Sequence, residues 1–255
     1  MTERLIMLKY TSSEYAAAAP HPSVLMPIVH ELQPPLFKGL AKSEIDHIVG
    51  AAVSRKCQRG TILSMEGESA EQFFMLTSGR ARYFTLTEDG RRVILRWIVP
   101  SEVFGAMAMM QDLETYLVST ELVRDGEVLM WSRGGIRHLV TRYPRLLDNI
   151  MTSMADYFRW YVAAHLALVS HSAPQRLARV VARLAKDIGR PTLDGVELDV
   201  TNEELADAAH ITRFSTSRLL SRWQRNGTLI KRRGKLFLTS SDRLFSYKPR
   251  SQAAI

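Results

Sequence analysis

Three hydrogen-bond donors gather near the start of one predicted helix in the last quarter of the chain. They are the side chains of Arg213, Ser217 and Arg218, and the predicted helix covers 213–226. The opposite, apolar face of this helix carries Leu219, Leu220 and Trp223. A helix of this kind buries one face and leaves the other exposed, so the donors are free to meet a partner. Guanidinium and hydroxyl groups are the donors that read the edges of nucleic-acid bases.

A second, shorter helix is predicted just before these donors. Thr201 and Glu204 have the spacing of a capping box, which predicts a helix over 203–209. The turn at 210–212 joins the two helices, and a strand, basic turn and strand follow over 229–238. Two helices and a hairpin in this order predict a winged helix-turn-helix, whose second helix enters the DNA major groove.

The net charge lies almost entirely in this part of the chain. The formal charge is +8, from 34 Lys and Arg against 26 Asp and Glu. Residues 171–255 hold 16 of the basic and 8 of the acidic residues, so the first 170 residues are neutral. A neutral domain joined to a basic one favours nucleic acid as a partner. Acidic proteins, lipids and a merely solvated basic surface remain alternatives on charge alone.

The elements that must position the donors begin with a sheet domain. Residues 1–29 have an alanine run, three prolines and no periodicity, and we interpret them as a loosely ordered extension. Between Leu36 and Ser132, short apolar or alternating runs recur, separated by turns such as Ser78-Gly79. This pattern is typical of a β-sandwich, barrel or jelly roll. A helix over 174–188 and a strand over 196–200 complete the C-terminal part.

A long helix is predicted between the two domains, from Pro144 to Ser170. Its apolar residues step by four and three alternately. They are Leu147, Met151, Met154, Phe158, Tyr161, His165 and Leu168. The stripe could pack on the chain's own sheet, but a helix of about 40 Å is longer than a small sheet domain can cover. We therefore predict a dimer interface along this stripe.

Composition and motifs argue against other classes of protein. No P-loop, nucleophile elbow or closely spaced histidine pair is found, so an enzyme is not expected. One cysteine cannot form an internal disulfide, and no apolar run is long enough to span a membrane, so we expect a cytoplasmic protein. His165 could bind metal or haem across a dimer, and Cys57 could be a redox switch; packing roles are the simpler interpretation of both.

An ordered set of short segments resembles the Crp/Fnr family of bacterial transcription regulators. The segments are 36–40, 59–62, 66–68, 78–81, 103–105, 175–178 and 201–223. The resemblance implies an α+β protein with an N-terminal β jelly roll, a long dimerisation helix and a C-terminal winged helix-turn-helix. It also implies a homodimer on a palindromic operator in double-stranded DNA, activating by contact with RNA polymerase.

The domain boundaries that we predict follow from this resemblance. They are 1–29 for the extension, 30–142 for the jelly-roll sensor domain, 143–170 for the dimerisation helix, 171–245 for the DNA-binding domain and 246–255 for a tail.

The effector site departs from the cyclic-AMP-binding members of the family. Those members have a glutamate for the ribose and an arginine-serine pair for the phosphate, where this chain has Ala106 and Tyr116-Leu117. A buried phosphate needs a cation or fixed donors, so we do not expect cyclic AMP to bind. The single Cys57 excludes the iron-sulfur cluster of the oxygen-sensing members. No cofactor is predicted.

An unknown small molecule is the remaining possibility for an effector. The residues that would form its pocket are Gly105, Ala106, Tyr116, Tyr157 and Tyr161. Core and dimer packing explain the aromatic residues of the long helix at least as well.

The resemblance also divides the predicted DNA contacts into two kinds. Base reading is assigned to Arg213, Phe214, Ser217 and Arg218, and phosphate contact to Thr212, Arg222, Lys231, Arg233 and Lys235. Arg218 matches the family's guanine-reading arginine. Phe214 stands where the family usually has a glutamate, so the operator is expected to differ at that base pair. The alternatives to this regulator are a sensor gated by another small molecule or haem, and a basic protein that binds DNA without sequence preference.

Overall fold

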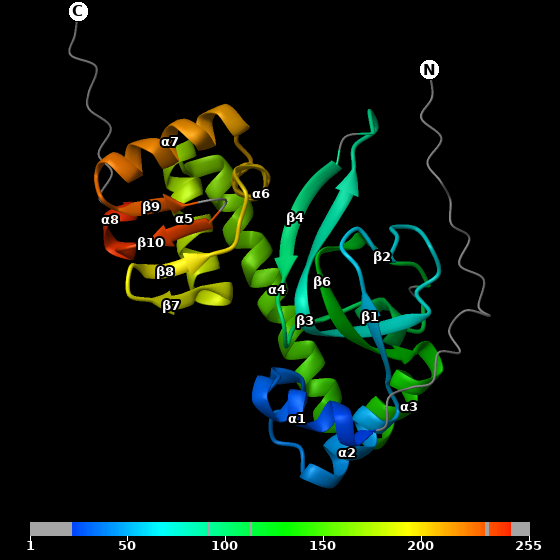
Figure 1. Ribbon diagram of the computed structural model, residues 1–255. Helices are drawn as coiled ribbons and strands as arrows, with labels where there is room; N and C mark the ends of the chain where they lie inside the picture. Colours follow the sequence, from blue (N-terminus) through cyan, green and yellow to red (C-terminus); the bar gives the residue numbers. More distant parts are fainter. Residues whose placement is uncertain (1–21, 91, 113, 233–234, 246–255) are drawn as a thin grey trace, which may run out of the picture.

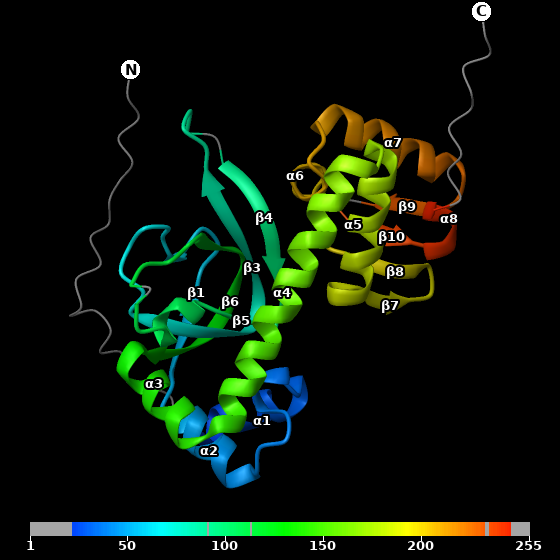
Figure 2. The ribbon, with the colours of Figure 1, turned by 180° about the vertical axis from the view of Figure 1, so that it is seen from behind.

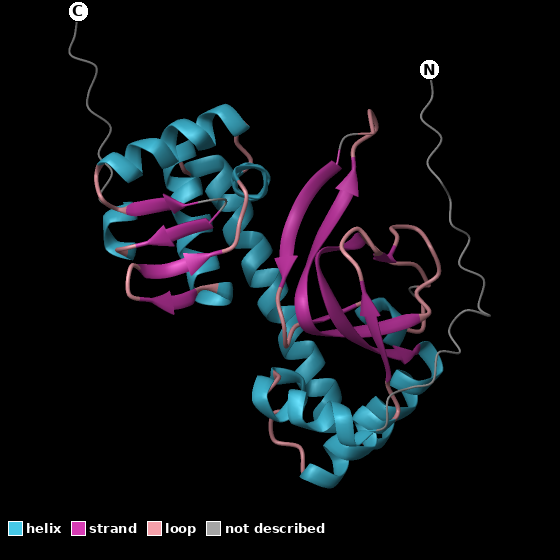
Figure 3. Cartoon of the chain, viewed as in Figure 1, coloured by secondary structure: helices cyan, strands magenta, loops and turns pink. Residues whose placement is uncertain are grey.

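The computed structural model describes residues 22–90, 92–112, 114–232 and 235–245. It shows an N-terminal β-sheet domain, a long helix and a C-terminal helical domain with its own small sheet (Figures 1 and 3). The predicted tail, 246–255, lies outside the described residues. Among the residues that are described, none of the helices has both the length and the apolarity that a membrane crossing needs.

The N-terminal domain is built on one antiparallel sheet of six strands. The strands are β1 (Val53–Cys57), β2 (Ile62–Ser64), β3 (Gln72–Leu86), β4 (Arg92–Ile98), β5 (Val103–Phe104) and β6 (Ser119–Ser132). The main order is β1-β6-β3-β4, with β2 on β6 and β5 on β3. Apolar side chains of β3, β6 and β1 bury one core, which includes Phe74, Leu76 and Val128.

The turn predicted at Ser78-Gly79 does not exist. Strand β3 runs through both residues, and its register against β6 shifts on each side of Ser78. Gly79 has φ of +83°, and a Cβ there would lie 2.5 Å from the carbonyl oxygen of Asp125. The glycine therefore lies in a β-bulge. A bulge uses the same positive φ as a turn but does not end the strand. The bulge sets the direction of the next side chain, Arg80.

Helices close the lower end of the sheet domain in Figure 1. They are α1 (Pro22–Leu32), the 3-10 turns η1 (Pro35–Phe37) and η2 (Ala106–Met109), α2 (Lys42–Gly50) and α3 (Arg133–Arg142). Helix α1 begins inside the segment predicted as a loose extension, and the sequence pattern predicts neither α2 nor α3. Val29 of α1 is buried with Leu36 and Ile48, so apolar packing orders this end of the extension. Residues 1–21 lie outside the described part of the chain.

Helix α4 (Pro144–Ser170) has the bounds that its sequence predicts. Its first turns are fixed to the N-terminal domain, because Leu146 and Ile150 are buried and the Asn149 side-chain amide donates to the carbonyls of Leu36 and Lys38 at 2.8 and 2.9 Å. From there it runs past the sheet to the C-terminal domain (Figure 2). Its remaining turns have no buried residues among those described.

The C-terminal domain packs its helices on a small sheet. Its elements are α5 (Ala173–Ile188), β7 (Arg190–Thr192), β8 (Gly195–Leu198), α6 (Asn202–Ala209), α7 (Arg213–Arg225), β9 (Leu229–Arg232), β10 (Lys235–Leu238) and α8 (Ser241–Phe245). The sheet order is β7-β8-β10-β9. The hairpin β9–β10 is the predicted wing. The core includes Leu177, Leu220 and Trp223, and it is joined by Phe84 and Trp97 from the other domain.

Candidate nucleic-acid interface and sensor cavity

The first helix of the helix-turn-helix, α6, is capped as its sequence predicts. The backbone N–H of Glu204 donates to the Thr201 hydroxyl at 3.1 Å, and the backbone N–H of Thr201 donates to the Glu204 carboxylate at 2.7 Å. Two backbone N–H groups at the start of α6 are therefore satisfied within one turn of chain. This local device fixes where the helix-turn-helix begins.

Arg176 of α5 holds the turn between α6 and α7. His210 ends α6 with φ of +49°, and the carbonyls of Ala209 and His210 come after the last turn that backbone N–H groups can satisfy. The Arg176 guanidinium donates to the carbonyls of Ala209 and His210 at 3.0 and 3.2 Å, and to that of His171 at 2.9 Å. One side chain thus joins the end of α4, the start of α5 and the turn. Sequence reasoning did not single it out.

The recognition helix, α7, separates an apolar from a polar face. Leu219, Leu220 and Trp223 are buried in the domain core. The four predicted base-reading side chains are all exposed, and they are Arg213, Phe214, Ser217 and Arg218. The phenyl ring of Phe214 is 76% exposed, which is unusual for so apolar a side chain. The structure therefore brings these four residues to one exposed face of α7.

Three of these four side chains have a contact within the chain. The Arg218 guanidinium carbon lies 6.0 Å from the centre of the Phe214 ring, at the limit of a cation–π contact. Arg213 forms an ion pair with Glu203, the second residue of α6. Because both residues of this pair are largely exposed, a DNA phosphate or base could displace the carboxylate at little cost.

The residues that are predicted to contact phosphates differ in their exposure and in the partners that they already have. Thr212 caps α7 by accepting from the backbone N–H of Ser215 at 3.1 Å, and Lys235 forms an ion pair with Glu197 at 2.7 Å. Arg222 and Lys231 are half-buried, and burial lowers the pKa of Lys231. Arg233 lies outside the described residues. Thr212 and Lys235 therefore already have partners in the free chain.

An arginine pair of the sheet domain holds the start of the helix-turn-helix. The Arg124 guanidinium on β6 lies 3.2 Å from the carboxylate of Asp199 and 3.2 Å from that of Glu204. Arg80 on β3 donates to the backbone carbonyl of Asp199 at 3.0 Å and lies over the Trp97 ring at 5.0 Å. We call Arg80, Arg124, Asp199 and Glu204 the interdomain clamp.

The charge of Arg80 is poorly screened by solvent, because this residue of the clamp is only 6% exposed. Burial lowers the pKa of Arg80, and its Nε is a buried atom without a hydrogen-bond partner. The hydrogen bond from Arg124 lowers the pKa of Asp199. Since a buried guanidinium is costly to leave unpaired, the carboxylates of the C-terminal domain stabilise it in this arrangement of the domains.

A cavity of about 810 Å³ lies between the sheet and α4, where the effector pocket is predicted. Gly105, Ala106, Tyr116 and Tyr157 line it; Tyr161 does not, and its side chain is 49% exposed. We call this space the sensor cavity. In the single chain Tyr161 therefore lies outside this cavity, because Tyr157, one turn earlier on α4, is the tyrosine that faces the sheet.

The sensor cavity offers little free positive charge for a phosphate, because its lining arginines, Arg96, Arg159 and Arg183, each form an ion pair with a carboxylate. The Tyr116 hydroxyl donates to the carbonyl of Gln72 at 2.9 Å and accepts from its N–H at 3.0 Å, so it braces the cavity wall. Arg96 forms an ion pair with Glu102 and lies 5.7 Å from the rings of Tyr157 and Trp160. Burial raises the pKa of Glu102.

Comparison with known proteins identifies the family. A model of the cyclic nucleotide-binding domain matches residues 54–143, and a model of the Crp-like helix-turn-helix domain matches residues 175–247. The chain is 26% identical over 196 residues to the anaerobic regulatory protein of Bacillus subtilis, covering 76% of this chain and 82% of that one. The chain belongs to the Crp/Fnr family. It is a DNA-binding transcription regulator of the Crp/Fnr type.

Other Crp/Fnr proteins show the same relationship. The cyclic AMP receptor protein of Thermus thermophilus is 28% identical over 186 residues, covering 73% of this chain and 83% of that one. The structure of the c-di-GMP responsive global regulator CLP of Xanthomonas campestris matches with a TM-score of 0.68 at 20% identity. That match covers 78% of this chain and all of the other, and it confirms the predicted architecture.

The apolar stripe of the Crp/Fnr long helix is largely uncovered in the single chain. Phe158 is 65% exposed, and Leu147, Met151, Tyr161 and Leu168 are exposed as well. His165 is exposed, whereas Met154 is half-buried and lines the sensor cavity. Exposed large apolar side chains in a row are typical of a surface that a partner covers.

The two alternative sensor residues receive no support from their surroundings. Cys57 is buried, and burial raises the pKa of its thiol, which disfavours the thiolate that a redox switch needs. Across the described part of the chain, no three His, Cys, Asp or Glu side chains are grouped so that they could hold a metal ion, and His165 is in no such group.

Proposed function

We propose that this Crp/Fnr chain is a cytoplasmic homodimer that binds a palindromic operator through α7 and activates transcription by contact with RNA polymerase. The observation that carries the proposal is the exposed row Arg213, Phe214, Ser217 and Arg218 above the buried face of α7. Support for a dimer comes from the exposed stripe of α4, and a dimer makes two copies of α7 available to two half-sites.

Selection of bound sequences from random double-stranded DNA tests this function. We expect a palindrome whose half-sites are about 10 base pairs apart, centre to centre, because each α7 needs its own major-groove face. Enrichment of no sequence would instead identify a basic protein that binds DNA without preference. Transcription from the selected operator with purified RNA polymerase, with and without the protein, then measures the sign of regulation.

A second function is favoured by the size of the sensor cavity. A space of about 810 Å³ is within the range of small-molecule sites, so gating by a ligand other than cyclic AMP is the alternative to an ungated regulator. Thermal unfolding with a panel of small metabolites, nucleotides and haem separates the two. A compound that binds only the folded protein raises its melting temperature.

Cyclic AMP is expected neither to bind nor to change operator affinity. The methyl side chain of Ala106 offers no acceptor to a ribose, and Tyr116, hydrogen-bonded to the backbone of Gln72, stands where a cation for the phosphate would be needed. Titration calorimetry and operator binding, each with and without the nucleotide, measure both parts. Micromolar binding accompanied by tighter operator binding would contradict this assignment of the cavity.

Reversing the charge of Arg124 is expected to weaken operator binding by about tenfold, within the usual range of coupling between domains. The variant Arg124→Glu places a third carboxylate beside Asp199 and Glu204, and so opposes the arrangement that the clamp holds. Operator affinity is the measurement, with cleavage by a protease near 171 as a report on domain release. Adding Asp199→Arg restores an ion pair and is expected to restore affinity. Full affinity of Arg124→Glu alone would show that the clamp does not position α7.

A further inference from the structure

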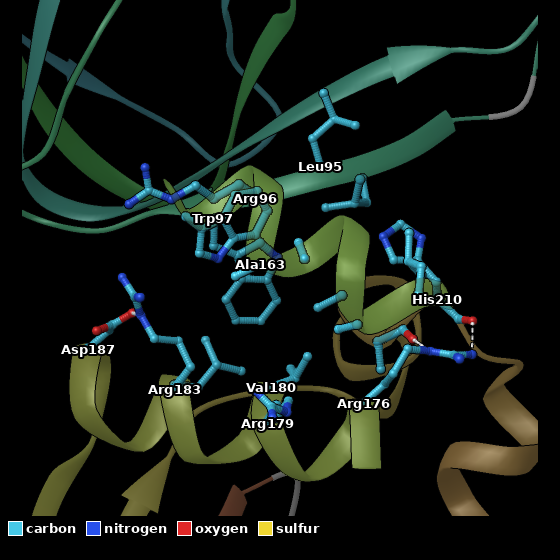
Figure 4. Close-up of a pocket in the computed structure, with 18 of the residues that line it drawn as sticks. Leu95, Arg96, Trp97, Ala163, Arg176, Arg179, Val180, Arg183, Asp187 and His210 are labelled. Atoms are coloured by element: carbon cyan, nitrogen blue, oxygen red, sulfur yellow. Dashed lines mark hydrogen bonds and ion pairs between the residues drawn. The ribbon is translucent and has the colours of Figure 1, made fainter. Parts of the chain in front are cut away.

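A second cavity lies at the junction of the two domains. Its volume is about 350 Å³, and its walls come from β4 of the sheet domain, the second half of α4, and α5, α6 and the end of α8 of the C-terminal domain (Figure 4). We call it the junction cavity. It shares Arg96, Trp160, Ala163 and Arg183 with the sensor cavity, but the remainder of its lining is its own.

The body of the junction cavity is apolar. Trp97 supplies an aromatic wall from the sheet domain, and small side chains of α4 keep the space open. Those small residues are Ala163, Ala164 and Ala167. Val180 and Leu184 form the wall on α5. A flat apolar molecule could pack between the indole and the alanine face, since aromatic surfaces contribute most of the contact area in such sites.

The rim of the cavity carries more positive than negative charge. Arg183 and Arg96 are compensated by ion pairs with Asp187 and Glu102. Arg176 bonds only to backbone carbonyls, which leave its charge uncompensated. Arg179 has no ion pair with any residue that the structure describes, and its side chain is exposed beside the apolar wall. Two arginines of α5 thus line the cavity without a carboxylate partner among the described residues: Arg179, whose side chain is exposed, and Arg176, whose guanidinium is directed to the turn at His210 (Figure 4).

We propose that the junction cavity binds a small organic anion with a flat apolar body, of the aromatic carboxylate or sulfonate class. Its volume is at the small end of the range for ligand sites, which suits a body of one or two rings. The guanidinium of Arg179 can donate two hydrogen bonds to two oxygens of such an anion, and Arg176 adds a second positive charge at the same rim.

The ligand would contact both domains at once. Trp97 and Arg96 belong to β4, whereas Arg176 and Arg179 belong to α5, so binding requires the domains to keep their present arrangement. The ligand therefore stabilises this arrangement by its own binding free energy. This inference goes beyond the proposed function, and its test contains no DNA.

Equilibrium dialysis with naphthalene-2-sulfonate tests the chemistry of the site. The full-length protein is expected to bind this anion at least tenfold more tightly than the neutral 2-naphthalenemethanol, because only the anion meets the uncompensated guanidinium groups. Arg179→Glu is expected to weaken binding of the anion by about tenfold, the effect of some 1.4 kcal/mol. The matched control is Lys186→Glu, the same charge change on an exposed residue of α5 that lines neither cavity.

A second pair of variants separates the two cavities. Ala167→Phe fills the junction cavity and is expected to abolish saturable binding, whereas Ser153→Trp fills part of the sensor cavity and is expected to leave it unchanged. Circular dichroism confirms that each variant is folded. Equal losses in Arg179→Glu and Lys186→Glu, equal affinity for the neutral probe, or a loss confined to Ser153→Trp would each overturn the proposal.

Discussion

A chain that carries Phe158→Glu and Tyr161→Glu is expected to sediment as a monomer. Both side chains are exposed on the stripe of α4, at 65% and 49%, and they occupy successive seam positions of the heptad-like pattern. In a dimer each glutamate would face its own copy across the seam, so charges would be buried without partners. Sedimentation velocity at several concentrations measures the effect.

The loss of operator affinity in this variant is expected to be large, about 10²- to 10⁴-fold. The second α7 of a dimer binds its half-site as an intramolecular event, and a monomer loses that advantage although every base contact remains available. Met154, another residue of the stripe, is the poorer choice because it also lines the sensor cavity.

Thr152→Glu is the matched control for the dimer. Thr152 is also exposed on α4, but it lies outside the stripe and lines neither cavity, so its change adds a charge to the same helix away from the seam. We expect this control to remain dimeric and to bind the operator normally. An unchanged dimer in the double variant would show that the subunits meet elsewhere.

Local signals in the sequence predict the helix-turn-helix well. The capping box of Thr201 and Glu204 predicts the start of α6, and both of its hydrogen bonds are present. Pro144 opens α4 at its first position, where its fixed φ is favourable and its missing N–H costs nothing. These devices depend on residues within one turn of each other, so a single sequence contains the whole signal.

The interdomain clamp has no such local signal. The hydrogen bond from Arg80 to the carbonyl of Asp199 joins residues 119 positions apart, and the contact of Arg124 with Asp199 joins residues 75 apart. Gly79, before Arg80, has the same positive φ in a bulge as in a turn, and the sequence pattern therefore predicts a turn within what is one strand. Only the packed sheet directs Arg80 towards the other domain.

The position of Tyr161 outside the sensor cavity has a related cause. A heptad-like pattern predicts which residues of α4 share a face, but it does not predict which neighbouring face lies against the sheet. The ring of Tyr83 on β3 meets the ring of Tyr157 at 5.7 Å between centres, and this contact directs Tyr157 towards the sensor cavity. Tyr161, one turn further along, stays on the exposed stripe.

Arg218→Ala is expected to cost about 1 to 3 kcal/mol at each half-site, roughly a 5- to 150-fold loss of affinity per half-site. Arg218 is exposed on α7, where its guanidinium can donate to both acceptors of a guanine. Sequence preference is expected to relax at one guanine in each half-site and to stay unchanged elsewhere. Binding to a library with a randomised half-site measures affinity and preference together.

Lys235→Ala is the matched contrast, because Lys235 is assigned to a phosphate. In the free chain its ammonium is paired with Glu197 at 2.7 Å, a partner that a phosphate has to replace. Its loss is expected to weaken all sequences alike and to reduce the slope of log affinity against log salt by about one per subunit, or about two for the dimer. A change in base preference would show that Lys235 contacts base edges and not the phosphate backbone.

Phe214→Glu tests base reading by α7 by adding an acceptor, whereas Arg218→Ala removes a donor. The substitution removes the ring that lies 6.0 Å from the Arg218 guanidinium and places a carboxylate one turn before it, where the two can pair. A carboxylate also accepts from the amino group of cytosine, whereas a phenyl ring offers only apolar contact, as to a thymine methyl. The half-site is therefore expected to shift towards cytosine, or adenine, at that position. If Arg218→Ala keeps full sequence preference and Phe214→Glu shifts no base, α7 does not read the groove, and every DNA contact assigned to it must move to another element.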